Sequence, residues 1–178
     1  LITAFGMEYL RDNFIGHNTK DLLESEWVKS EYGHPGVSVE TPKVLKRSPM
    51  MAELSKKTFA EVKDVAVFAY GSMTDNFYIV VSTTTYKQPI DSDLNAAMEG
   101  ALKSEEFATG KGVTGLRAYG NMSMPEPITK KPVRVYYEMY YFKQEHGLQN
   151  VMVMHKEGDE YGAQILERIK NSVELRIN

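Results

Sequence analysis

The residues of this chain that could do chemistry are scattered, and their spacing matches no catalytic or metal-binding motif. The four histidines, His17, His34, His146 and His155, fall in separate segments and lack the i, i+4 spacing of a helical zinc site. The sequence has no cysteine, which removes disulfides, a thiol nucleophile and a thiolate metal site. We therefore predict no catalytic residue, no metal and no cofactor, and we do not expect an enzyme.

Two short motifs imitate ligand-binding loops but have simpler structural explanations. Asp91-Ser-Asp93 begins like a calcium loop, yet Leu94 follows at once and no glycine stands at the sixth position, so an N-cap explains the acids better. Gly110-Lys-Gly-Val-Thr-Gly115 lacks the order of a phosphate-binding loop and is predicted to end a helix. A hydrolase built on carboxylates or His155 stays open as a minor alternative, because separation in space is invisible here.

The best candidate for a binding surface is a tyrosine-rich hairpin near the C-terminus. Residues 132–144 alternate as a long strand, residues 145–147 form the turn, and residues 148–155 return. In either of the two likeliest registers, one face of the hairpin gathers Tyr and Met side chains, and we expect this layer to be core: Tyr137, Met139, Tyr141, Met152 and Met154.

The opposite face of the hairpin combines apolar bodies with charged and hydroxyl tips, and Val151 and Val153 join it from the return strand. Such a face is typical of a half-covered sheet or of a recognition surface. We expect the terminal helix to cover it, with binding of a partner or ligand as the alternative. The predicted binding residues are Arg134, Tyr136, Glu138, Tyr140 and His155.

Such a hairpin needs further strands beside it. Residues 27–32 and 37–41 form an early hairpin around the turn at 33–36, and residues 58–70 pair with residues 77–86. In the second of these strands, apolar side chains alternate onto both faces, so we expect layers on both sides of the sheet. Residues 113–129 are predicted to hold one strand around 116–119 and another that reaches Ile128.

Helical spacing occurs twice. A stripe from Leu94 to Leu102 predicts a helix within residues 91–107, and Ile165, Leu166 and Ile169 predict a closing helix over residues 159–173 with Asp159 as its cap. The basic cluster between Lys43 and Lys57 is interpreted as a solvated loop. The first 25 residues are expected to be an N-terminal arm or helix, followed by a single domain over residues 26–178.

Composition narrows the class of protein. A chain of 178 residues with 42% hydrophobic and 25% charged residues is typical of one ordered domain. A net charge of -3 offers no basic face for nucleic acid. The opening apolar run is too short to cross a bilayer, so we expect no membrane insertion, and a removed upstream signal or anchor would explain a start at Leu1.

In its order of elements the chain resembles the PsbP-like family, which includes the extrinsic photosystem protein, the bacterial DcrB-like envelope proteins and a Ran-binding import protein. The matching features span nearly the whole chain: Trp27 at the start of the first strand, Gly36-Val-Ser-Val-Glu-Thr-Pro42, the helix at 95–102, the strand at 133–141 with its return, and Ile165-Leu-Glu-Arg-Ile-Lys-Asn-Ser172.

The resemblance implies an α+β fold, an α/β/α sandwich whose central, mainly antiparallel sheet is flanked by helices. It implies a non-catalytic binding or assembly domain, exported or lipoprotein-like, in the periplasm or envelope of a bacterium, with a protein partner there. The cytoplasm remains the alternative compartment. The alternative function is a small-molecule carrier with a pocket between sheet and helices. Neither the resemblance nor the residues fix the oligomeric state.

Overall fold

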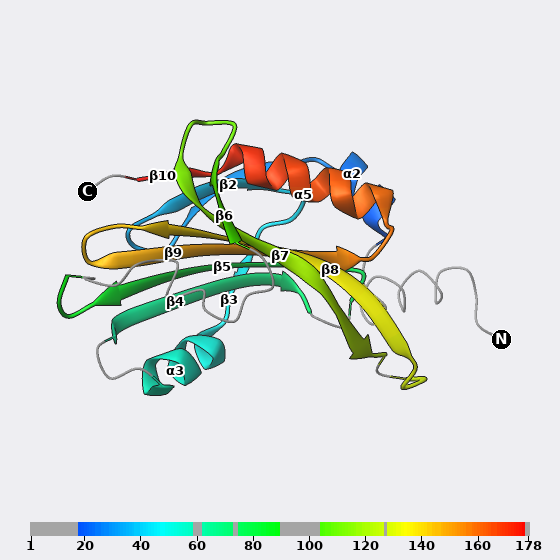
Figure 1. Ribbon diagram of the computed structural model, residues 1–178, viewed down its shortest axis with the longest axis horizontal. Coiled ribbons are helices and arrows are strands. Elements are labelled where there is room, and N and C mark those ends of the chain that lie inside the picture. The colour runs from blue at the N-terminus through cyan, green and yellow to red at the C-terminus, as the bar shows by residue number, and fades with distance from the viewer. Residues whose placement is uncertain (1–17, 59–61, 73–74, 90–103, 127, 177–178) are drawn as a thin grey trace.

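The structure, a computed structural model, describes residues 18–58, 62–72, 75–89, 104–126 and 128–176. In that part of the chain the strands form two sheets in which every pairing is antiparallel, and a few helices pack against them (Figure 1). This is the mixed α+β class expected from the alternation of strand and helix patterns. The predicted helix stripe at 94–102 and His17 lie outside the described residues.

The smaller sheet has the order β1-β2-β10. Strands β1 (Val28–Tyr32) and β2 (Val37–Thr41) are the predicted early hairpin, in which Tyr32 stands opposite Val37. The turn between them needs Gly33, because its φ is +77° and a Cβ there would lie 2.2 Å from the Thr83 hydroxyl oxygen. The short β10 (Glu174–Leu175) joins the other edge of β2 and was not predicted.

The larger sheet has the order β3-β4-β5-β9-β8-β7-β6. Its centre contains the two predicted strand pairs, β4 (Val62–Gly71) with β5 (Phe77–Tyr86) and β8 (Pro132–Lys143) with β9 (Gly147–Lys156). The hairpin register is one of the two expected, since Tyr137 lies opposite Met154 and Tyr136 opposite His155. The outer strands are β3 (Lys46–Arg47), β7 (Thr114–Pro125) and β6 (Ser104–Ala108).

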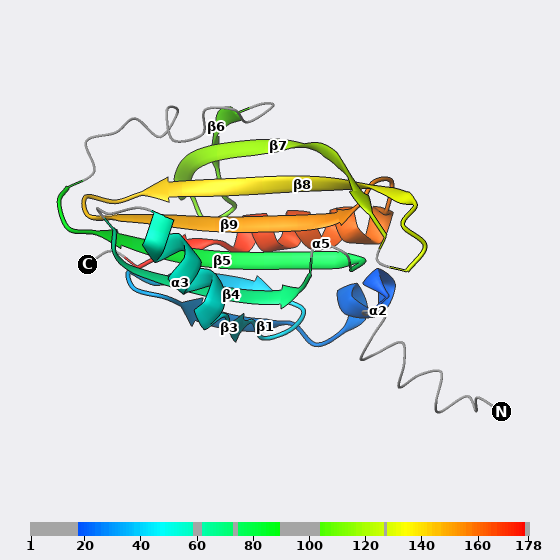
Figure 2. The ribbon, with the colours of Figure 1, turned by 90° about the horizontal axis from the view of Figure 1, so that it is seen from below.

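Helices lie on opposite faces of the larger sheet (Figure 2). Helix α5 (Glu160–Ser172) is the predicted closing helix, and the Asp159 side chain accepts hydrogen bonds from the Tyr161 and Gly162 amides as its N-cap. The short α2 (Thr19–Glu24) packs beside α5. On the other face, α3 (Pro49–Thr58) packs against β4.

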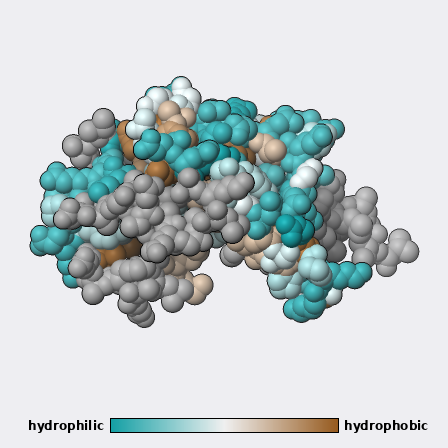
Figure 3. All heavy atoms as spheres, in the orientation of Figure 1, coloured by the Kyte–Doolittle hydropathy of each residue, from teal (hydrophilic) through white to brown (hydrophobic). Residues whose placement is uncertain are grey.

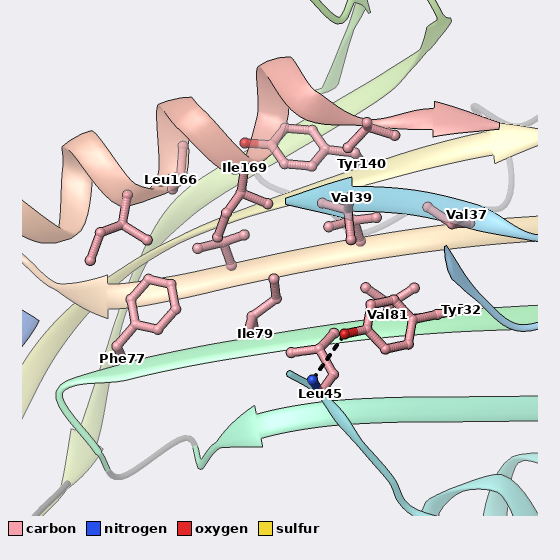
Figure 4. Packing of buried hydrophobic residues seen from close by; sticks show 14 of the residues in the cluster. Tyr32, Val37, Val39, Leu45, Phe77, Ile79, Val81, Tyr140, Leu166 and Ile169 are labelled. Carbon is pink, nitrogen blue, oxygen red and sulfur yellow. Dashed lines mark hydrogen bonds between the residues drawn. The ribbon is translucent and has the colours of Figure 1, made fainter. Parts of the chain in front are cut away.

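The main core lies between the larger sheet, α5 and the smaller sheet (Figure 4). Ile165, Leu166 and Ile169 of α5 face a layer of fully buried side chains, and burial of that apolar surface is the dominant stabilising term. The Tyr32 hydroxyl accepts a 3.0 Å hydrogen bond from the Leu45 amide, so this buried hydroxyl is satisfied within the core. The sheet residues of this core include Ile79, Val81, Tyr140, Phe142, Val151 and Val153.

The Met and Tyr layer of the hairpin belongs to a second, smaller cluster under α3. Tyr137 and Met154 are buried there, but Met139 and Met152 are only half-buried. The expectation that this layer is core is therefore confirmed for Tyr137 and Met154, while Met139, Met152 and Tyr141 are only half-buried. The larger core lies on the opposite face, because α5 and the smaller sheet both pack there.

Three sequence expectations are corrected. Residues 104–108, placed in the helix of 91–107, form strand β6, and Gly110 and Gly112 sit in the β6–β7 turn instead of ending a helix. The described part of residues 113–129 contains one strand, β7, which ends at Pro125, and Ile128 lies in a turn with 86% of its surface exposed. The basic segment contains α3, which Pro49 begins at the helix position that proline favours.

Packing explains these differences. The Phe107 ring lies 5.2 Å from the ring of Tyr140 and 5.8 Å from that of Phe142, which fixes β6 against the sheet. Gly115, interpreted as a breaker, is a strand glycine in close contact, since a Cβ there would stand 2.5 Å from the Tyr141 carbonyl oxygen.

Candidate functional site

The five predicted binding residues do share one face of the β8–β9 hairpin, but that face is interior. Glu138, Tyr140 and His155 are buried and Tyr136 is half-buried, because α5 covers this side of the sheet. Arg134 lies apart near the end of β8, exposed, where it forms a 3.0 Å ion pair with Glu157. The structure thus brings four of the five residues together beneath the terminal helix.

Glu138 is the centre of a closed polar cluster. The hydroxyl of Tyr136 donates to Glu138 Oε2 at 2.9 Å, and that of Tyr140 donates to Oε1 at 3.0 Å. Arg117 of β7 forms a buried ion pair with Glu138 through Nε and also bonds Glu105 of β6 at 2.5 Å. We name these five residues, Glu105, Arg117, Tyr136, Glu138 and Tyr140, the Glu138 cluster.

The electrostatics of the Glu138 cluster favour fixed charges. Burial acts to raise the pKa of Glu138, but hydrogen bonds from Arg117 and Tyr136 and the charge of Arg117 outweigh it, so the pKa lies below its usual range. Burial and then the Glu138 carboxylate raise the pKa of the Tyr136 and Tyr140 hydroxyls. A carboxylate held ionised with its oxygens occupied is poorly suited to act as a general acid or base.

His155 lies beside the cluster, with its ring 5.4 Å from the ring of Tyr136. Its Nδ1 is 2.7 Å from the Lys156 carbonyl oxygen, which assigns the proton to Nδ1. The buried Nε2 has no hydrogen-bond partner among the described residues. Gly162 of α5 packs directly on this side chain, since a Cβ on Gly162 would stand 2.6 Å from the His155 Cβ.

Sequence reasoning missed Arg117 and Glu105. Both lie near Glu138 only because β6 pairs with β7 and β7 pairs with β8. No local sequence pattern predicts that order of strands. The available signal was weak: Arg117 is a charged residue between Leu116 and Ala118 in a stretch with strand propensity. A charge in such a place must find a partner when the strand is covered.

A second candidate site is an open cleft of about 690 Å³ at the β8–β9 turn of the hairpin, where several other turns also meet. The β1–β2 turn contributes His34 and Pro35, the β6–β7 turn contributes Val113, and the β8–β9 turn contributes residues 143–147. Leu175 of β10 completes one wall. This end is on the left of Figure 1, near the C-terminus. We call this site the turn cleft.

The turn cleft is held by bonds between its separate walls. The Arg176 amide donates to the Gly36 carbonyl oxygen at 2.9 Å, and the Gln144 side-chain amide donates to the Arg176 carbonyl oxygen at 3.4 Å. Thr85 of β5 donates to the His34 carbonyl oxygen at 3.3 Å. A cleft braced in this way is preformed, which lowers the entropic cost of binding.

The chemistry of the turn cleft is mixed. Pro35, Val113 and Leu175 supply apolar surface, while the exposed rim includes one cation, Lys143, and one anion, Glu145. His34 and His146 also line it, and both are exposed. Sites for organic ligands combine apolar walls with a few polar groups in this manner.

The described residues hold no group of three or more His, Asp or Glu side chains placed to bind a metal ion. Within the same part of the chain, no helix is both long and apolar enough to cross a membrane.

No protein-family model matches this chain, and a search of curated proteins finds no match either. The sequence and the geometry of its sites therefore carry the functional argument.

Proposed function

We propose that this chain is a non-catalytic binding or assembly domain of the PsbP-like type, which acts in the cell envelope and binds a protein partner in the turn cleft. The fold part of the proposal is supported by the antiparallel sheet with helices on both faces and by the order of sequence features from Trp27 to Ser172. The compartment is proposed from the resemblance alone.

One observation carries the binding proposal. The turn cleft is open to solvent and built by segments far apart in the chain, whereas Glu138 and Tyr140 of the Glu138 cluster are buried and the Glu138 oxygens are occupied by Arg117, Tyr136 and Tyr140. An open, braced cleft with unlike charges on its rim suits recognition. A carboxylate whose oxygens are occupied in this way suits stability of the fold better than acid–base chemistry.

A polypeptide segment fits the mixed lining best. Its apolar side chains would contact Pro35, Val113 and Leu175, and its backbone and polar groups would meet the rim, where Lys143 and Glu145 offer charges of both signs. Protein interfaces combine an apolar centre with a polar rim in the same manner.

The test narrows the cleft with a large side chain and measures the loss of binding. Thr114 lines the cleft and is exposed, so Thr114→Trp narrows it without disturbing a buried contact. Gln164→Trp, on the exposed side of α5, is the matched control. Cross-linking in envelope extract, followed by titration with the purified partner, should give a polypeptide that binds the wild type and the control and binds Thr114→Trp at least tenfold more weakly. A polypeptide that binds both variants equally would place recognition elsewhere.

The volume of the cleft favours small-molecule carriage as a second candidate, since ligand pockets typically span about 300–1,000 Å³. Thermal-shift screening of a metabolite library separates the two. A stabilising compound whose effect disappears in Thr114→Trp, with no polypeptide partner, would replace the first proposal. Turnover of any substrate in a broad activity profile, abolished by Glu138→Gln or by substitution of His155, would overturn the non-catalytic assignment.

A further inference from the structure

The two outer edges of the larger sheet differ in how they are protected against pairing with a further strand. On the β4 side, β3 pairs with Phe68 and Ala69, and the Ser48 amide bonds the Val67 carbonyl oxygen. Farther along, the Asp64 carboxylate accepts the Val65 amide at 3.0 Å, and the register shifts at a bulge. Charges and bulges of this kind prevent edge-to-edge pairing.

Among the described residues, the β7 edge has no such charge or bulge between Gly120 and Met124, and Pro125 stands at its end. Strand β6 pairs with Thr114–Ala118 only, and no described strand lies outside Gly120–Met124. The Thr109 amide bonds the Val113 carbonyl oxygen, and alternation along the strand then directs the amide and carbonyl groups of Asn121 and Ser123 outward. No charged residue occurs between Arg117 and Glu126.

This edge is on a projecting hairpin, and hydrogen bonds join described residues on both sides of its tip. In the turn after β7, the Glu126 carboxylate accepts hydrogen bonds from the Thr129 amide at 2.7 Å and from its hydroxyl at 2.5 Å. The tip is the lobe at the lower right of Figure 3. We name the β7–β8 segment beyond Ala118 the arm.

The outer edge of the arm is self-complementary. In antiparallel pairing, residues with outward amides must stand opposite one another. A two-fold axis at Met122 achieves this: Asn121 of one copy then faces Ser123 of the other, and Gly120 faces Met124. Partly exposed Met122 and Met124 from both copies would join the same apolar face.

The charges agree with this orientation. Lys130 and Lys131 are exposed at the tip of the arm, and Glu105 and Glu106 are exposed at its base on β6. Antiparallel pairing brings the tip of one copy beside the base of the other. Glu126 at the tip opposes this attraction, but the two lysines outnumber it. Closed two-fold association through one shared patch is the commonest form of oligomer.

We propose that two copies of this chain associate through the outer edge of Gly120–Met124, forming one continuous antiparallel sheet across a two-fold axis at Met122. The pairing is independent of the proposed function, because the turn cleft lies at the opposite end of β8.

Cysteine cross-linking tests the register directly, since the natural chain has no cysteine. Facing residues at the axis lie about 4.5 Å apart between Cα atoms, within the range that a disulfide spans. Met122→Cys should therefore form a covalent dimer in mild oxidant, whereas Met124→Cys, displaced from its own copy along the strand, should form little. Equal cross-linking of the two variants would refute the register.

Sedimentation equilibrium tests the association itself. Asn121→Pro removes an outward amide and keeps the bonds to β8. Because the two-fold axis repeats the contact, each dimer loses two hydrogen bonds, and dimerisation should weaken about tenfold or more. Asn121→Ala keeps the amide and should leave the dimer unchanged. Lys131→Glu should weaken it, and Glu106→Lys added to that variant should restore it. A wild type that stays monomeric at every concentration would overturn the proposal, whatever Thr114→Trp shows.

Discussion

Glu138 lies on a polar face for which the sequence suggested either cover by the terminal helix or binding of a partner, and the structure places α5 over it. Tyr136, Tyr140 and His155 lie near Glu138 as the alternating strand and the hairpin register imply, whereas Arg134 lies apart near the end of β8. The contact with Arg117 could not be predicted, because Arg117 lies on β7 and the sequence does not show that β7 pairs with β8. The sequence therefore predicted which residues meet, but not that they satisfy one another.

We expect the Arg117–Glu138 pair to be strongly coupled. Glu138→Leu leaves a guanidinium with 18% of its side chain exposed and two tyrosine hydroxyls without their acceptor, and should lower the free energy of unfolding by about 3–5 kcal/mol. The double variant Glu138→Leu with Arg117→Met also removes the guanidinium. Its loss of unfolding free energy should be smaller than that of Glu138→Leu alone. Urea unfolding measures both. Additive losses would mean that the pair is not coupled.

Acid should remove the contribution of the Arg117–Glu138 pair to stability. The pKa of Glu138 is lowered in the folded protein, so its contribution to stability is fully present above the unfolded value near 4.5 and is lost as pH falls through the lower folded value. The stability difference between wild type and Glu138→Gln should be constant near neutral pH and shrink in acid. Urea unfolding at a series of pH values measures this difference. A difference that grows in acid would contradict the assignment.

At the scale of elements, local patterns predicted well wherever one period ran without interruption. The β8–β9 hairpin and α5 fall close to their expected bounds because alternation and the Asp159 cap are local signals. Strands β6 and β7 did not, and Gly115 shows why: it is a strand position where the neighbouring strand β8 approaches closely. Tertiary contacts overrode the local preference there.

Helix α5 offers a test of such a close approach. Gly162→Ala raises helix propensity and would stabilise an open helix by up to about 1 kcal/mol. Here the new Cβ would meet the His155 side chain at 2.6 Å, so we expect a net loss of about 1–3 kcal/mol from overpacking. The neighbouring exposed Ala163 gives the control, because Ala163→Gly should follow propensity alone. In a His155→Gly background, which removes the His155 Cβ, the penalty of Gly162→Ala should fall, and thermal unfolding measures it.

At the scale of the whole molecule, the two faces of the larger sheet are unequal, and the cleft and the arm lie at opposite ends of its long strands. The face toward α5 receives a helix and a second sheet, so its side chains are almost completely buried. The face toward α3 keeps Val133, Met139 and Met152 half-buried. Stability should therefore depend mainly on the first face.

Matched deletions test that asymmetry. Val153→Ala and Val133→Ala remove the same atoms from adjacent strands, but Val153 is fully buried in the main core and Val133 is half-buried in the arm. Loss of a buried valine side chain, with the cavity it leaves, should cost about 2–3 kcal/mol at Val153 and less than half of that at Val133. Urea unfolding of both variants provides the comparison. Equal losses would mean that the Met-rich face is as completely covered as the face beneath α5, and the edge of the arm would then have little apolar surface to offer a second copy.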